Sequence, residues 1–385
     1  MDKDKIRLTV TAAVPGDVCN LRCKYCYVSQ LNDHKFTKAE FNYSVDHMLK
    51  ALNKERLGGI ASIVYCGTGE TLVPREIIDM VKGSLKEGHF VEIVTNLTLN
   101  NRIDELINEI PPEDMKRLMV KGSLHYLELK RLNKLDDYFD NMKKLVDAGA
   151  SCFPFLVVCE EYIPYLDEII QLCIDNIGEP PQITAYMEFD TAQNIHKKAD
   201  MYNAELVSML KEKFHSNVYE VYNEMLDINT QEHFCYAGEW SLHVELKDGS
   251  TKKCHGCPIE QNIFEDLTKP IHFEPIGNNC CMKDCSIQYN FRTWGLVPYY
   301  KDLPTYAQTI CRDKLFNETI KQGFNHKFYN IRQLHTEEEK KKINKAVSKK
   351  FAKLCSQKLS WKNKIRLSAY NYLRIKLLKK GLIQE

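Results

Sequence analysis

The chain has 385 residues, 44% of them hydrophobic, and a formal net charge of +1, so it can form a large globular core. No run of about 18 uncharged apolar residues occurs, and the N-terminus MDKDKIRLTV lacks the apolar stretch of a signal peptide. We therefore expect a cytosolic protein. Its fifteen cysteines indicate metal sites, because a reducing compartment disfavours many disulfides.

The first 190 residues alternate between β-branched runs, which predict strands, and segments with the periodicity of amphipathic helices. This alternation favours a parallel sheet with right-handed crossovers, as an open barrel or a doubly wound sheet. In a parallel barrel, chemistry occurs at the carboxyl ends of the strands. Strands are expected at residues 6–12, 61–67, 90–96, 119–126, 152–158 and 183–189, and helices at 42–53, 75–88, 103–110, 136–149 and 165–178.

Three cysteines, Cys19, Cys23 and Cys26, follow the first predicted strand within eight positions. A structural zinc site takes four protein ligands, and His34 is the nearest conceivable fourth. A cubane iron–sulfur cluster held by three thiolates instead leaves one iron open to bind a ligand. This spacing, with the aromatic Tyr25 before the last cysteine, resembles the CxxxCxφC signature of radical S-adenosylmethionine (SAM) enzymes.

The resemblance implies a [4Fe-4S] cluster that binds SAM at its open iron, and reductive cleavage of SAM to a 5′-deoxyadenosyl radical. In such enzymes the cofactor supplies the chemistry, and the protein orients it and excludes water. The resemblance covers about residues 6–190 and implies an α/β fold, a partial (β/α)6 TIM-like barrel over residues 1–190. A zinc knuckle, or buried free thiols, is the alternative interpretation of the three cysteines.

Other polar residues at the ends of predicted strands are similar to family motifs. The stretch CGTGET resembles a glycine-glycine-glutamate motif whose backbone receives the methionyl ammonium of SAM, although Thr68 replaces the first glycine. A Thr-Asn pair ends the third strand where the family often has Thr-Asn-Gly, with Leu97 in place of the glycine. Ser123 and His125 alternate on the fourth predicted strand and are expected to face SAM or substrate; a core histidine is the alternative for His125.

The cofactor-binding residues expected from this resemblance are Tyr25, Gly67, Thr68, Gly69, Glu70, Thr95, Asn96, Ser123 and His125.

A second group of cysteines begins with a predicted hairpin that starts after Cys235, turns at Asp248-Gly249 and ends in Cys254. It resembles the opening of the SPASM and twitch extensions of radical SAM enzymes, which hold auxiliary four-iron clusters. The later cysteines do not reproduce the full SPASM pattern, so we expect one auxiliary [4Fe-4S] cluster rather than two. A four-thiolate zinc ribbon is the alternative. The expected ligands are Cys235, Cys254, Cys281 and Cys285, with Cys257 and Cys280 in reserve.

Composition divides the chain into residues 1–190, a helical linker and Cys-rich extension over 191–325, and a basic helical tail over 326–385. Residues 340–380 contain fifteen Lys or Arg and no Asp or Glu. An apolar stripe beside them is typical of a helix on a membrane surface, on nucleic acid, or on the acidic body of the same protein. We expect residues 336–385 to make peripheral contact with the inner face of the membrane, and we expect no nucleic-acid partner.

The resemblance implies hydrogen abstraction followed by oxidation, with an auxiliary cluster as electron acceptor, or by epimerisation. The first strand begins by residue 6, which leaves no room for the leader-binding domain of many peptide-modifying relatives. We therefore expect a sugar, a lipid-linked sugar or another small molecule, whose hydroxyl groups Glu188 and Asp190 at the end of the sixth strand would bind. A flavodoxin- or ferredoxin-type protein is the expected reductant, under anaerobic conditions.

Two alternatives remain open from the sequence. One is the same radical chemistry on a peptide or protein, as in RiPP maturases or sulfatase-maturing enzymes. The other is a non-enzymatic zinc module whose basic tail binds nucleic acid.

Overall fold

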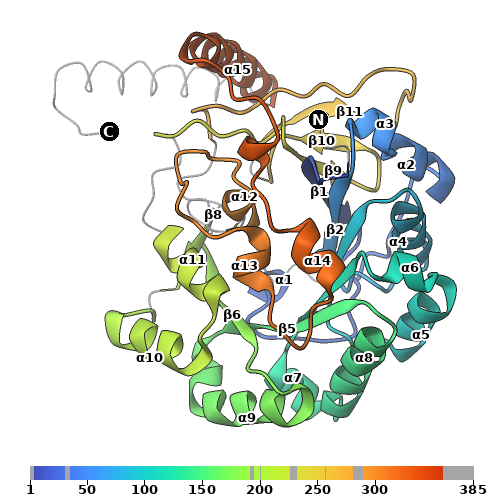
Figure 1. Cartoon of the computed structure of the whole chain (residues 1–385), viewed down its shortest axis with the longest axis vertical. Coiled ribbons are helices and arrows are strands. Elements are labelled where there is room, and N and C mark those ends of the chain that lie inside the picture. The colour runs from blue at the N-terminus through green and yellow to red at the C-terminus, as the bar shows by residue number, and fades with distance from the viewer. Residues whose placement is uncertain are drawn as a thin grey trace. The chain divides into compact units, whose positions relative to one another are not determined.

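The computed structural model describes residues 4–30, 35–190, 195–199, 201–225, 232–255, 257–280 and 289–358. Its main sheet has nine strands in the order β11-β10-β9-β1-β2-β3-β4-β5-β6, of which β1 to β6 run parallel (Figure 1). The partial six-stranded TIM-like barrel predicted from the sequence is therefore confirmed. The six strands are β1 (Leu8–Val14), β2 (Ala61–Gly67), β3 (Phe90–Thr95), β4 (Leu118–Ser123), β5 (Ser151–Val158) and β6 (Gln182–Ala185).

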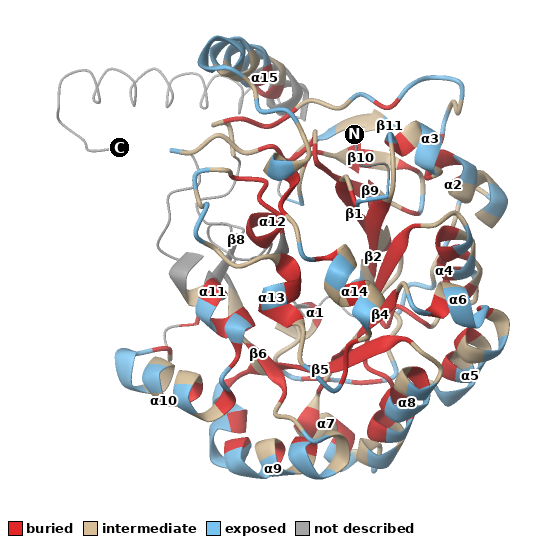
Figure 2. Cartoon of the chain, in the orientation of Figure 1, coloured by how far each residue is buried: buried red, intermediate tan, exposed pale blue. Residues whose placement is uncertain are grey.

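Amphipathic helices cover the outer face of these strands. In α8, for example, Tyr138, Phe139, Met142 and Leu145 recur at short helical intervals and are buried on one face. Figure 2 shows buried strands inside helices whose outward faces are exposed. The helices are α1 (Tyr27–Gln30), α2 (Val45–Ala51), α3 (Lys54–Leu57), α4 (Glu76–Lys86), α5 (Asn100–Glu109), α6 (Pro112–Met115), α7 (Tyr126–Arg131), α8 (Leu135–Asp147) and α9 (Leu166–Ile177), with the 3-10 helix η1 at Glu160–Tyr165.

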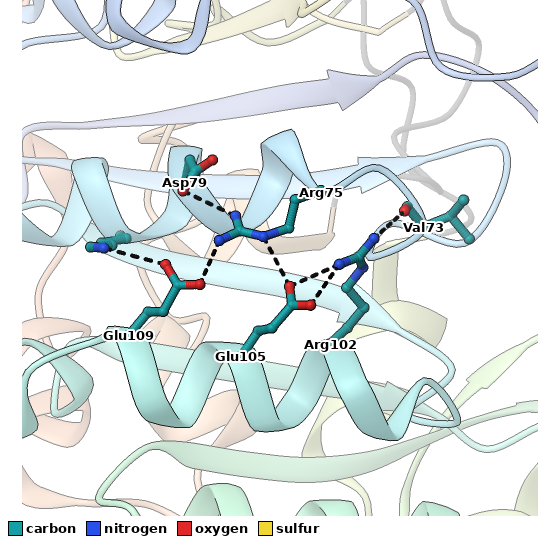
Figure 3. Close-up of polar contacts among 7 residues, drawn as sticks. Val73, Arg75, Asp79, Arg102, Glu105 and Glu109 are labelled. Atoms are coloured by element: carbon teal, nitrogen blue, oxygen red, sulfur yellow. Dashed lines mark hydrogen bonds and ion pairs between the residues drawn. The ribbon is translucent and has the colours of Figure 1, made fainter.

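Two arginines connect α4 to α5 (Figure 3). Arg75, just before α4, lies 3.0 Å from the Glu105 carboxylate and also contacts Glu109. Arg102 contacts Glu105 at 2.8 Å and donates a hydrogen bond to the carbonyl oxygen of Val73 at 3.4 Å. Partly exposed pairs of this kind contribute at most about 1 kcal/mol each. They fix the chain that follows β2 against α5.

The predicted hairpin is present, and it extends the barrel sheet. β9 (Ser241–Glu245) pairs with β10 (Ser250–Lys252) in antiparallel orientation, and β10 pairs with β11 (Ile259–Asn262). Gly249 has φ +80° at the turn, where an added Cβ would lie 2.4 Å from the Phe264 side chain. β9 also lies parallel to β1. The sequence did not predict this pairing, which places the Cys-rich hairpin directly beside the barrel.

Residues 289–334 pack against the amino ends of the barrel strands. His326 contacts the carbonyl oxygen of Ile6, just before β1, at 2.8 Å, and the Phe324 ring lies 5.6 Å from that of Phe90 at the start of β3. The Tyr306 hydroxyl donates to the carboxylate of Glu92 on β3 at 2.7 Å. This segment contains α12 (Tyr289–Thr293), α13 (Tyr306–Ile310), α14 (Glu318–Gly323) and the 3-10 helix η2 (Phe328–Asn330).

The sixth strand is shorter than predicted. β6 ends at Ala185, because the N–H of Tyr186 donates to the Tyr202 hydroxyl instead of to a neighbouring strand. The placement of Glu188 and Asp190 on strand six was therefore wrong. Both belong to β7 (Met187–Asp190), which pairs with β8 (Ile195–Lys198) in a separate two-stranded sheet, and the helices α10 (Ala204–Phe214) and α11 (Asn217–Met225) follow.

The chain divides into a compact unit over Met1–Leu334 and a second over His335–Glu385. Residues 326–334, which we assigned to the tail, thus belong to the first unit. The second contains α15 (Glu337–Lys358), and the tail beyond residue 358 lies outside the described residues. Thr336 and Glu339 cap the start of this helix reciprocally, at 2.7 Å and 3.3 Å. Among the described residues, no helix is long and apolar enough to cross a membrane.

Candidate active site

A cavity of about 610 Å³ lies at the carboxyl ends of the parallel strands. Its walls are the loops after β1, β2 and β3 together with inward-facing residues of β4, β5 and β6. All nine residues predicted to bind the cofactor and all three cysteines of the first motif line it. Parallel strands end at a common edge, which explains how motifs more than 100 residues apart in sequence meet here.

The first motif occupies the loop between β1 and α1. Cys26 donates its backbone N–H to the carbonyl oxygen of Cys23 at 3.2 Å, and the Cys19 sulfur accepts from the N–H of Leu21 at 3.4 Å. Burial raises the pKa of the Cys19 thiol to about 11, and it raises the pKa of Cys23 as well. Metal coordination opposes this effect because it stabilises the thiolate. The loop thus presents three thiols to one cavity.

The donor set of this loop, three thiols on one cavity, is that of a three-thiolate cluster. Among the described residues, no three His, Cys, Asp or Glu side chains close around one metal ion. A cubane takes one thiolate per iron, so its three ligands stand farther apart than the ligands of one ion. Cys19, Cys23 and Cys26 would hold such a cluster at the wall of the cavity, and the cluster would bind SAM.

The loop after β2 packs tightly on the cysteine loop. A Cβ added to Gly69 would lie 2.4 Å from the carbonyl oxygen of Val18, and one added to Gly67 would lie 2.6 Å from that of Val14. Both positions therefore require glycine. Thr68, which replaces the first glycine of the family motif, donates its hydroxyl to the carbonyl oxygen of Gly16 at 2.6 Å.

Glu70 links the ends of β2 and β3. Its carboxylate is 6% exposed and accepts hydrogen bonds from the Leu72 N–H at 3.1 Å, the Thr95 hydroxyl at 2.5 Å and the Asn96 N–H at 2.8 Å. Burial raises the pKa of Glu70, while these three donors lower it. Its contacts lie within the protein, so Glu70 positions the motif.

Asn96 holds the cysteine loop from the other side. Its side-chain amide donates to Asn20 at 2.8 Å and also contacts the Cys19 sulfur at 3.8 Å. Thr98 completes the cluster by donating its hydroxyl to the Asn96 oxygen at 2.6 Å. Sequence analysis missed Asn20 and Thr98. Asn20 lies inside the cysteine motif, and this position in the sequence could have identified it.

Leu97 explains how the chain tolerates the missing glycine of the Thr-Asn-Gly motif. Its φ is +57°, in the left-handed region that glycine favours, at a cost of about 1–2 kcal/mol for a residue with a Cβ. The side chain is fully buried, and Gly122 leaves space for it, since a Cβ there would lie 2.5 Å from Leu97. The backbone conformation is thus kept although the residue differs.

The placement of His125 on the fourth strand was wrong. β4 ends at Ser123, where a tight turn brings the His125 N–H to the Ser123 carbonyl oxygen at 3.1 Å, and His125 precedes α7. Its ring still lines the cavity. Burial lowers the pKa of His125 to about 4, so the ring is neutral, and its Nδ1 shares a hydrogen bond with the Tyr25 hydroxyl.

The structure describes part of the predicted auxiliary site. Cys235 and Gly277 exchange two backbone hydrogen bonds, at 3.1 Å and 3.0 Å, which brings Cys235 near the segment that reaches Cys280. The Cys257 N–H donates to the carbonyl oxygen of Cys254 at 3.0 Å in a tight turn. The other two expected ligands, Cys281 and Cys285, lie outside the described residues. The ligand set therefore stays a prediction.

The unpredicted residues that line the cavity include Lys121 and His255. Lys121 points inward from β4, two residues before Ser123, and His255 follows β10, beside Cys254. Side chains alternate between the two faces of a strand, so the position of Lys121 two residues before Ser123 could have identified it as a cavity residue. No local signal existed for His255, because it reaches the cavity only through the pairing of β9 with β1.

Residues 13–173 match a family model described as the Radical SAM superfamily. The chain is 25% identical over 288 residues to the GTP 3',8-cyclase of Clostridium perfringens (strain 13 / Type A), covering 74% of this chain and 76% of that protein. Among solved structures, Streptococcus suis SuiB aligns with a TM-score of 0.47 and 17% identity over 68% of this chain and 64% of SuiB, which is less than two thirds of its length. The structure titled "Native anSMEcpe with bound AdoMet" aligns with a TM-score of 0.44 and 14% identity, covering 68% and 80% of the two chains.

The family match spans the cysteine loop, the glycine-rich loop and the strands β2 to β5. Residues 13–173 are therefore a radical SAM superfamily domain, the kind of domain in which a [4Fe-4S] cluster binds SAM.

Proposed function

We propose that this enzyme abstracts a hydrogen atom from a small molecule, such as a sugar or a lipid-linked sugar, and oxidises or epimerises it. The observation that carries this proposal is the cavity of about 610 Å³, a size typical of small-molecule sites. The cyclase relative, whose name gives GTP as its substrate, supports the same substrate class. The radical SAM assignment argues against the alternative of a non-enzymatic zinc module.

The residues of the chain have separate roles in this proposal. The cluster and SAM, when bound, supply the radical. Cys19, Cys23 and Cys26 would hold the cluster, and Glu70 and Asn96 keep their loops in place through the hydrogen bonds given above. The ring of Tyr25 lies 5.8 Å from that of His125 and 6.4 Å from that of Tyr186. These rings exclude water from one wall of the cavity, which protects a radical from side reactions.

The Cys-rich hairpin supports an auxiliary cluster close to the substrate. His255, next to Cys254, lines the cavity, so the end of the hairpin reaches the place where substrate would bind. A redox centre at that position would accept the electron that an oxidation releases. Either a flavodoxin or a ferredoxin would supply the electron that starts the reaction.

Anaerobic reconstitution tests the proposal. We expect about eight irons per chain, for two four-iron clusters, and release of 5′-deoxyadenosine from SAM when dithionite is added. Replacing Cys19, Cys23 and Cys26 together by Ala should remove about four irons and abolish SAM cleavage. The matched control is Cys173→Ala, because Cys173 is buried on α9 and does not line the cavity. SAM cleavage by the triple variant would contradict the assignment.

Deuterium transfer tests the substrate class. The enzyme is incubated with fractions of a deuterated extract of the native host, and mass spectrometry detects deuterium in 5′-deoxyadenosine. Transfer from the small-molecule fraction is expected. Transfer from the peptide and protein fraction alone would contradict this proposal and support the peptide alternative.

We also propose that residues 336–385 bind an anionic membrane surface, on the basis of their fifteen basic residues within 340–380. Flotation with phosphatidylserine liposomes should recover the full chain with the lipid and leave a chain truncated after residue 335 in the soluble fraction. Equal recovery of both in the soluble fraction would contradict this role.

A further inference from the structure

A lysine lies in the cavity below the residues expected to face SAM. Lys121 and Ser123 are two residues apart on β4, so their side chains point to the same side of the strand, about 7 Å apart along it. Both line the cavity. In the register of β3 and β4, Lys121 stands opposite Val94, which also lines the cavity. The lysine is thus one layer farther from the cysteine loop than Ser123.

Its neighbours hold the ammonium group in position. Lys121 Nζ lies 4.0 Å from the centroid of the Phe155 ring, another lining residue, and a cation over an aromatic face is attracted to it. Glu92, on β3 and 2% exposed, accepts the Tyr306 hydroxyl. Burial raises the pKa of Glu92 and the charge of Lys121 lowers it. Lys121 therefore lies over an aromatic ring and interacts electrostatically with a buried carboxylate.

Lys121 is the only lysine or arginine among the described residues that line the cavity. The two carboxylates of the lining face their own chain: Glu70 accepts the three hydrogen bonds described above, and Asp17 accepts the N–H groups of Lys35 and Thr37. Lys121 therefore carries the basic side chain of the deeper cavity, with the buried Glu92 carboxylate beside it. In the low-dielectric interior of a protein, the attraction of an ammonium group for an anion is stronger than at the surface.

We infer that Lys121 binds an anionic group of the substrate, a carboxylate or a phosphate, and that the substrate is an acidic small molecule. This inference rests on the proposed function, because it assumes a small-molecule substrate. A lysine acts as a point charge for both kinds of anion. With the anion at Lys121, the rest of the molecule extends past Phe155 and Tyr186 toward the cysteine loop.

Inorganic phosphate and acetate are suitable probes, since the complete substrate is unidentified. Line broadening in phosphorus and carbon NMR reports their binding to the full-length, cluster-loaded enzyme. Lys121→Met should weaken binding of the preferred probe at least tenfold, and Lys121→Arg should retain it. The matched control is Lys143→Met, at an exposed position outside the cavity, which should bind like the native protein. Preference for phosphate or for acetate identifies the anion.

Removal of Lys121 leaves Glu92 buried without its cation, so Lys121→Met is compared with the double variant Lys121→Met/Glu92→Gln, which has no buried charge to compensate. Anion binding and the KM for SAM are measured for the native protein and for both variants. Equal anion binding by the native protein and both variants would overturn the inference. A tenfold increase in the KM for SAM in both variants would overturn it too, because the lysine would then serve the cofactor.

Different results would contradict the small-molecule function and the anion site at Lys121. If the native protein cleaves SAM but its anion binding does not depend on Lys121, only the inference is lost. If anions bind through Lys121 and the protein transfers deuterium from peptides alone, the small-molecule function is lost and the anion site remains.

Discussion

The rim and the floor of the barrel are both polar and buried, but they are assembled differently. We define the rim as Glu70, Thr95 and Asn96, and the floor as Glu92 and Tyr306. The Glu70 carboxylate accepts three hydrogen bonds from residues at the ends of β2 and β3. The Glu92 carboxylate accepts the hydroxyl of a residue 214 positions later in the chain. The rim is thus local to the radical SAM domain, whereas the floor depends on the segment after the Cys-rich region.

The difference indicates how one barrel can keep its cofactor and change its substrate. The glycine contacts and the Glu70 hydrogen bonds fix the loops that surround the cysteines and leave them little freedom. The floor also contains Tyr306, a later residue that these loops do not constrain. Substrate specificity is therefore expected to reside in the floor and in the deeper cavity above it.

Replacing Glu70 gives the largest expected effect on stability. Glu70→Ala leaves three buried donors without an acceptor, and each costs about 1–3 kcal/mol, so we expect the free energy of unfolding to fall by about 4 kcal/mol. Glu70→Gln keeps one acceptor oxygen and should lose less than half as much. Urea unfolding measures both. A loss of under about 1 kcal/mol for Glu70→Ala would show that the rim is held by other contacts.

The sequence predicted the rim because its motifs are short and each follows a predicted strand. The CGTGET stretch and the Thr-Asn pair each lie within a few residues, and the topology of a parallel barrel brings such ends together. The predicted end of a strand was wrong where that end is set by a hydrogen bond to a residue outside the strand. β6 ends at Ala185 because Tyr202 takes the next N–H, and no pattern within the strand indicates this.

The sequence could not predict the floor for the same physical reason. In the sequence, Glu92 is an isolated polar residue in an apolar strand. Tyr306 is one of many aromatic residues in a segment without regular periodicity. Only the folded chain shows that residues 289–334 contact the amino ends of the strands. The pairing of β9 with β1, which brings His255 to the cavity, is a long-range contact of the same kind.

His89, near the floor of the barrel, makes the free energy of unfolding dependent on pH. It lies just before β3, where Nδ1 accepts the Ala61 N–H and Nε2 donates to the Leu52 carbonyl oxygen, each at 3.0 Å. Burial lowers its pKa from 6.5 to about 4. Between these values the unfolded chain binds more protons than the folded one, so stability falls as the pH drops from 6.5 to about 4, by up to about 3 kcal/mol.

His89→Gln preserves a donor and an acceptor but does not titrate. Urea unfolding across this pH range should show a shallower loss of stability for the variant than for the native protein. The same slope in both proteins would mean that His89 is protonated in the folded state.

A smaller effect is expected at the bond between the floor and the later segment. Tyr306→Phe removes the hydrogen bond to the buried Glu92 carboxylate and should lower the free energy of unfolding by about 2 kcal/mol. The control is Tyr329→Phe, whose hydroxyl has a single long contact of 3.5 Å to Lys301 and should cost under about 0.5 kcal/mol. Equal losses in the two variants would show that Tyr306 acts through packing alone.

The smallest effect is expected for Arg102, which connects the rim to α5. Its guanidinium contacts Glu105 and the carbonyl oxygen of Val73, and the N–H of Val73 in turn donates to the carbonyl oxygen of Glu70 at 3.2 Å. Arg102→Met should cost only about 0.5 kcal/mol, because the side chain is partly solvated. If the glycine contacts already fix the loop, the KM for SAM should change by less than about twofold. Lys116→Met, which breaks the similar but remote pair with Glu113, is the control. A tenfold rise in the KM for Arg102→Met alone would mean that the rim depends on α5, and the contrast between a self-contained rim and a dependent floor would then fail.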